Sequence, residues 1–189
     1  MLESLELTAA VLVGWSMGSF VIWDYVRQFG TDRLAGVVIV DQSASDYGWP
    51  DWPYGFLDFD ELCHVMAAVQ TDRAALFDEF IPLLFKDDPG EHGDWIREAA
   101  GGIPPTIASS IIFDQTVQDF RSLLASVDVP ALVCFGRDEK LVPVAAGEHL
   151  AASMPHARLV VFEESGHSPF VEESDRFNET VDEFVRSLG

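Results

Sequence analysis

A serine, an aspartate and a histidine occur in this sequence in an order that could support nucleophilic catalysis. Ser16 lies in the pentapeptide GWSMG, Asp138 in GRDEKLVP and His167 in ESGHSPF. A serine hydroxyl is a weak nucleophile at neutral pH, so it needs a general base, and the base needs a carboxylate that orients it. The three residues therefore predict acyl-transfer chemistry, with Ser16 as the nucleophile, His167 as the base and Asp138 as its partner.

Four apolar, β-branched runs predict the strands that would position these residues, at 8–15, 34–42, 130–136 and 157–165. Helical spacing follows at 17–29 and 144–153, and Ser174 is expected to cap a final helix. Strands that alternate with helices predict an α/β fold with a four-stranded parallel sheet and flanking helices. Ser16, Asp138 and His167 would then each follow the carboxyl end of a strand.

The pentapeptide has the strand-turn-helix context of a nucleophile elbow. Such a turn is sharp and strained, so the residues two before and two after the serine are expected to lack bulk, as Gly14 and Gly18 do. The backbone NH of Met17, at the helix amino terminus, is the predicted oxyanion donor. Asp41, which follows the second predicted strand, remains the alternative to Asp138 as the carboxylate.

The segment 43–127 contains no strand pattern and is predicted to be a helical cap inserted in the core, which comprises 1–42 and 128–189. Helical patterns occur near 58–70, 72–86, 92–100 and 115–126. Such an insertion is expected to lie over the carboxyl ends of the strands, where ligands bind in parallel sheets. Some of its aromatic residues are expected to face the serine and form an apolar substrate pocket: Trp49, Trp52, Tyr54, Phe56, Phe59 and Trp95.

Composition limits the classes of partner. The 189 residues suit one domain, and a net charge of −21 would repel nucleic acid and anionic membrane surfaces. The acid excess is consistent with solubility and also with adaptation to high salt, and the sequence leaves both open.

Other features argue against metals, cofactors and export. Cys134 lies in an apolar run, so it is predicted to be a buried thiol rather than half of a disulfide. The histidines have no spacing typical of a zinc site, and no metal or cofactor is expected. No signal-peptide pattern or 18-residue apolar stretch occurs, which predicts a cytoplasmic protein.

The stretches LVGWSMGS, GRDEKLVP and SGHSPFVEES resemble the α/β-hydrolase superfamily, in particular the branch of small esterases that includes cofactor-free haloperoxidases. The resemblance spans nearly the whole chain and implies the roles given above for Ser16, Met17, Asp138 and His167. Family members have four strands and two helices before the elbow, which is about 80 residues more than this sequence has there. The resemblance therefore implies a sheet equivalent to family strands 5-6-7-8, with its first strand as a bare edge open to self-association. The sequence leaves open whether the chain is a genuine short protein, a fragment, or the product of a misplaced start codon.

These inferences predict a serine hydrolase that acts on small carboxylic esters through an acyl-enzyme. Perhydrolysis of the haloperoxidase type would use the same residues with peroxide as the second nucleophile. The alternative of a different class is a non-catalytic hydrolase fragment that binds ligands through its cap.

Overall fold

The computed structural model describes residue 2 and residues 4–189. Its centre is a four-stranded parallel sheet in the order β1-β2-β3-β4, as predicted. The strands are β1 (Ala10–Trp15), β2 (Leu34–Val40), β3 (Ala131–Gly136) and β4 (Ala157–Phe162). The apolar runs are β-branched and nearly unbroken because the inner strands are buried on both faces.

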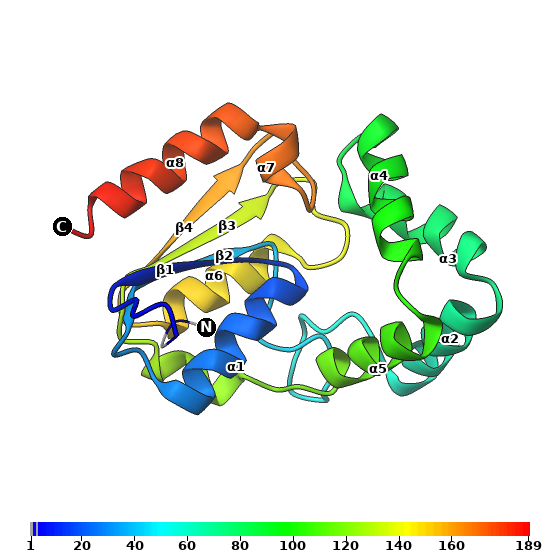
Figure 1. Cartoon of the computed structure of the whole chain (residues 1–189), viewed down its shortest axis with the longest axis horizontal. Coiled ribbons are helices and arrows are strands. Elements are labelled where there is room, and N and C mark those ends of the chain that lie inside the picture. The colour runs from blue at the N-terminus through cyan, green and yellow to red at the C-terminus, as the bar shows by residue number, and fades with distance from the viewer. Residues whose placement is uncertain (1, 3) are drawn as a thin grey trace.

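Helices cover the two faces of this sheet (Figure 1). α1 (Met17–Phe29) and α6 (Val144–Ser153) pack with the larger core cluster, which includes Trp23 and Phe135. α8 (Ser174–Arg186), preceded by the short α7 (Pro169–Glu172), packs on the other face through Phe177 and Phe184. Alternating residues of β2 and β3 enter the two clusters, as the period of a strand requires.

The segment between β2 and β3 is helical. It contains α2 (Phe59–Thr71), α3 (Arg73–Phe80), the 3-10 turn η1 (Ile81–Leu84), α4 (Gly90–Gly101), α5 (Pro105–Thr116) and the 3-10 turn η2 (Arg121–Ser126). Figure 1 shows α2 to α5 on the side of the sheet toward which the arrows of β3 and β4 point. The ends of the segment, including Trp52 and Phe120, pack in the larger core cluster. The division into a core and a cap stays a prediction.

Two helical features differ from the sequence prediction. The predicted helix at 115–126 is wrong: this range holds only the end of α5, which stops at Thr116, and the 3-10 turn η2. Pro105 is the first residue of α5. A backbone NH at this position has no acceptor within the helix, so a proline there costs no hydrogen bond. Ser174 lies inside α8 and does not cap it: Glu173 is the capping residue and makes no side-chain cap bond.

β1 lies at one edge of the described sheet, since only β2 pairs with it. Val13 on this strand is 56% exposed, and Val21 on the adjoining helix is 66% exposed. Cys134 is fully buried, as predicted, whereas Cys63 is exposed. None of the helices in residues 4–189 is both long and apolar enough to cross a membrane.

Candidate active site

Ser16 connects β1 to α1 with φ 50° and ψ −123°, a conformation that is strained for a residue with a side chain. Its NH donates to Val40 O at 2.9 Å, and its carbonyl accepts from Ser19 N at 2.8 Å. These bonds hold the sharp turn that the pentapeptide predicts. Met17 is the first residue of the helix, so its NH has no intrahelical acceptor.

The two glycines of the pentapeptide have different roles. A Cβ at Gly14 would lie 2.6 Å from the carbonyl carbon of Gly18, because the strand and the helix approach each other there. A Cβ at Gly18 would meet nothing within 4 Å. The prediction that both positions must lack bulk is therefore right for Gly14 and wrong for Gly18 in this chain.

His167 lies in the loop after β4 and is 1% exposed. Its Nδ1 lies 2.5 Å from Oε2 of Glu139, and its carbonyl accepts a 2.7 Å hydrogen bond from Trp15 Nε1. Trp15 precedes Ser16, so this bond ties the histidine loop to the serine turn. Nε2 of His167 is buried and has no hydrogen-bond partner among the described residues, which leaves it free to accept a hydroxyl proton.

The predicted pairing of Asp138 with His167 is wrong in this structure, because Glu139 occupies that place. The Asp138 side chain is 46% exposed and forms a 3.0 Å ion pair with Lys86, whereas the Glu139 side chain is fully buried. Oε1 of Glu139 also accepts from the NH of Leu141 at 2.6 Å. Adjacent residues in a turn direct their side chains differently, so only one of the two acids can face the imidazole.

Asp41, the alternative carboxylate, lies in the same cluster. It follows β2, is 0% exposed, and accepts from Gly136 N at 2.8 Å through Oδ1. Oδ2 is buried without a partner in the described structure. Burial, and then the charge of Glu139, raise the pKa of Asp41 well above its usual value.

Side-chain atoms of Asp41, Glu139 and His167 lie within 4.8 Å of one another, which raises the question of a metal ion. Two ligand atoms on one tetrahedral zinc ion would be roughly 3.3 Å apart, given bonds of about 2 Å. The 2.5 Å between Nδ1 of His167 and Oε2 of Glu139 is well below that separation and is that of a short hydrogen bond. The geometry fits a proton between these atoms better than a shared metal.

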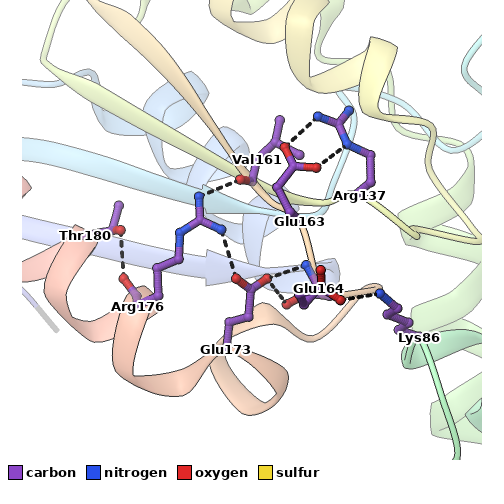
Figure 2. A network of polar contacts seen from close by, with 9 residues as sticks. Lys86, Arg137, Val161, Glu163, Glu164, Glu173, Arg176 and Thr180 are labelled. Atoms are coloured by element: carbon purple, nitrogen blue, oxygen red, sulfur yellow. Dashed lines mark hydrogen bonds and ion pairs between the residues drawn. The ribbon is translucent and has the colours of Figure 1, made fainter.

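The histidine loop is held by acidic residues near the start of α8. Glu173 accepts hydrogen bonds from Ser165 Oγ at 2.7 Å and Glu164 N at 3.0 Å, and it pairs with Arg176 at 2.8 Å (Figure 2). Burial by itself would raise the pKa of Glu173, but these hydrogen bonds hold it below its usual value. Glu172 accepts from Gly166 N at 2.8 Å and so fixes the residue before His167.

The only two lysines of the sequence connect this loop and the Glu139 loop to the helical segment. Lys86 pairs with Glu164 at 2.7 Å (Figure 2). It also pairs with Asp138 at 3.0 Å. Lys140 donates to the carbonyls of Pro82, Phe85 and Lys86 at 3.2, 2.7 and 3.0 Å. The end of η1 is thereby tied to both loops that carry candidate site residues.

A cavity of about 620 Å³ lies between α1 and α5, beside Met17. Its apolar lining includes Met17, Phe20, Val21, Ile107, Ile111 and Phe120. None of the six aromatic residues, some of which were predicted to face the serine, lines this cavity. Trp49, Trp52, Tyr54 and Phe56 pack with the larger core cluster, while Phe59 and Trp95 are exposed.

Comparison with families of known proteins places this geometry in context. The sequence model of the family described as the alpha/beta hydrolase family matches residues 1–180 of this chain. The pimeloyl-(acyl-carrier protein) methyl ester esterase of Neisseria meningitidis serogroup A is 28% identical over 184 residues, which are 96% of this chain and 58% of that protein. The esterase of the same name from Nitrosomonas europaea is 29% identical over 169 residues, 87% of this chain and 66% of that protein.

Solved structures show the same fold. An esterase from Exiguobacterium antarcticum superposes with a TM-score of 0.92 at 24% identity, over 98% of this chain and 69% of that one. A bromoperoxidase from Bacillus anthracis has a TM-score of 0.89 at 27% identity, over 98% and 70% of the two chains. This chain therefore spans between about three fifths and seven tenths of the length of these four relatives.

Proposed function

Because this chain belongs to the alpha/beta hydrolase family, we propose that it carries the catalytic residues of a serine hydrolase that cleaves carboxylic esters. The observation that carries the proposal is the buried His167, with Nδ1 on Glu139 and with Nε2 unpartnered. The strained Ser16, tied to the histidine loop through Trp15, supports it. The two relatives named above as methyl ester esterases support carboxylic esters as the substrate class.

In the proposed mechanism, Nε2 of His167 takes the proton of Ser16 as Oγ attacks the ester carbonyl. The backbone NH of Met17 donates to the developing oxyanion. His167 then protonates the leaving alcohol, and an acyl-serine remains. Water, deprotonated by His167, attacks that acyl group, and the acid is released as Ser16 regains its proton.

Glu139 takes the role predicted for Asp138. Its carboxylate holds the Nδ1 proton and so directs Nε2 toward the serine, and it stabilises the imidazolium that forms in each step. We place the apolar part of the substrate in the cavity beside Met17, against apolar side chains such as Phe20 and Ile111, while polar and charged side chains form the rest of its lining.

Labelling with a fluorophosphonate probe tests the proposal. The wild-type chain should label at Ser16, and the variants Ser16→Ala and His167→Ala should not. A short-chain aryl ester should be hydrolysed with the same pattern of losses. If the wild type labels no faster than Ser16→Ala, the chain is a non-catalytic binding module and the proposed function is wrong.

Perhydrolysis is the second candidate, because a bromoperoxidase is among the similar structures. Peroxide would replace water in the attack on the acyl-serine, and a peracid would be released. The same residues would serve, so Ser16→Ala should remove both activities. Adding hydrogen peroxide to the ester assay and measuring peracid separates the two outcomes.

We also propose that the chain self-associates through β1. The strand is an edge of the described sheet, and Val13 and Leu7 near it are exposed. An unpaired apolar edge is a template for a second copy of the same strand.

A further inference from the structure

Asp41 is a buried acid that the proposed mechanism does not use. It follows the inner strand β2, between the ends of β1 and β3. Oδ1 is satisfied by Gly136 N at 2.8 Å, whereas Oδ2 is buried with no donor in reach among the described residues. Burying a carboxylate oxygen without a hydrogen-bond donor costs free energy, and this cost depends on whether the carboxyl group of Asp41 is protonated.

The groups that face Asp41 are mostly acidic. Glu139 is in contact across the cluster, and the negative charge of Glu172 also acts on it. The thiol of Cys134, on β3, is neutral because burial raises its pKa to about 12. No lysine or arginine of the described structure forms an ion pair with Asp41.

Two buried carboxylates in contact cannot both remain ionised at low cost, so one of them keeps a proton. Glu139 has donors for its charge: His167 Nδ1 at 2.5 Å and the NH of Leu141 at 2.6 Å. Asp41 has one donor, Gly136 N, and a second oxygen that is buried without a donor among the described residues, with a Glu139 oxygen within 4.8 Å of its carboxylate. The proton therefore belongs on Asp41, where it turns the orphaned acceptor into a donor.

We propose that Asp41 is a positioning residue that acts as a neutral carboxylic acid, with Oδ2–H donating a hydrogen bond to the Glu139 carboxylate. This inference rests on the proposed function. Glu139 is then fixed between an O–H donor from the end of β2 and the imidazole of His167. The cluster carries its single negative charge on the residue that touches the histidine.

Asparagine at position 41 imitates this neutral acid. Its Oδ1 can accept from Gly136, and its Nδ2 can donate to Glu139, but it cannot ionise. Leucine has a similar volume and no donor. If Asp41 instead served as the ionised catalytic carboxylate, Asp41→Asn would be as damaging as an Asp→Asn change in a serine triad, about 10,000-fold.

The test compares Asp41→Asn, Asp41→Leu and Glu139→Gln by the rate of fluorophosphonate labelling from pH 6 to pH 9. We expect Asp41→Asn to stay within threefold of wild type with a superimposable pH profile, and Asp41→Leu to be at least tenfold slower. Asparagine and leucine fill a similar volume, but only asparagine can donate a hydrogen bond. A faster rate in Asp41→Asn than in Asp41→Leu would therefore show that the hydrogen bond matters and not the volume. An Asp41→Asn rate as low as that of Asp41→Leu would overturn the inference.

A second readout does not depend on activity. The Nδ1 proton of His167, observed by NMR, should keep its downfield position in Asp41→Asn and move upfield in Asp41→Leu, because Glu139 is less well fixed there. An equal movement in both variants would contradict a donor role for Asp41. Failure of the wild type to label better than Ser16→Ala would reject the proposed function, and the NMR result would still decide the role of Asp41.

Discussion

His167 and Glu139 meet through Nδ1 and Oε2 at 2.5 Å, and both side chains are almost completely buried. A buried imidazole held on one nitrogen by a carboxylate has a fixed tautomer and orientation, provided that the carboxylate itself does not rotate. The NH of Leu141 restrains Glu139 on one side, and we assign the other restraint to Asp41.

The turn that carries Ser16 provides a matched pair of variants. Gly14→Ala should destabilise the fold by about 3 kcal/mol or more, because the new Cβ would overlap the backbone of Gly18. Gly18→Ala should leave stability unchanged or raise it by up to about 1 kcal/mol, since alanine favours the helix and has space. Urea unfolding measures both, and equal losses in the two variants would refute this account of the turn.

Asp46 should make stability fall as the pH rises. It is fully buried, and burial raises its pKa to about 7, although a hydrogen bond from Gln115 partly opposes this shift. The native state therefore binds this proton more tightly than the unfolded state, and the corresponding stability is lost between pH 4 and pH 7.

Asp46→Asn cannot ionise and should escape that loss. Relative to wild type, its free energy of unfolding should rise by up to about 4 kcal/mol between pH 4 and pH 8. Asp87→Asn, at an exposed site, is the control and should follow the wild-type curve. Parallel curves for Asp46→Asn and wild type would contradict the burial argument.

Lys140 should keep the end of η1 attached to the loop that carries Glu139. Lys140→Met removes three hydrogen bonds to the carbonyls of Pro82, Phe85 and Lys86. Amide hydrogen exchange over 81–86 should become about tenfold faster, which corresponds to about 1.4 kcal/mol of local stability. Arg186→Met, near the carboxyl end of α8, is the charge-matched control. Unchanged exchange in Lys140→Met would show that these bonds do not hold the segment.

Self-association through β1 should depend on Val13. A lysine at this exposed edge position opposes pairing of β1 with the β1 strand of a second copy, because the lysine charges of the two copies would repel each other. Sedimentation should show a concentration-dependent oligomer for the wild type and a shift toward monomer for Val13→Lys. A wild-type chain that is monomeric at all concentrations would refute the proposed contact.

The sequence predicted the sheet because the four apolar runs have the composition and length of buried parallel strands, and the periodicity of 17–29 and 144–153 matched α1 and α6. It missed α5, because the prolines at 104 and 105 suggested a break, whereas Pro105 begins the helix. Apolar and polar residues are not separated onto opposite faces of α5, so the hydrophobic periodicity of the sequence did not indicate a helix there.

The candidate site was predictable to within one residue. The position of an acid after β3 followed from the strand, but composition does not determine which of two adjacent acids faces inward. One signal was available: Glu139 directly precedes Lys140 and the apolar Leu141 and Val142, where the chain turns back into the core. The contact between Asp41 and Glu139 depends on the pairing of β2 with β3 and on burial, neither of which local sequence specifies.

The assignment of Glu139 as the partner of His167 is tested most directly by comparing Glu139→Gln with Asp138→Asn. In serine-probe labelling and in ester hydrolysis, Glu139→Gln should lower the rate about 1,000- to 10,000-fold, because a neutral amide neither fixes the tautomer nor stabilises the imidazolium. Asp138→Asn should stay within about threefold of wild type, since its exposed side chain contacts Lys86 and not the imidazole. A large loss in Asp138→Asn together with an active Glu139→Gln would contradict the assignment.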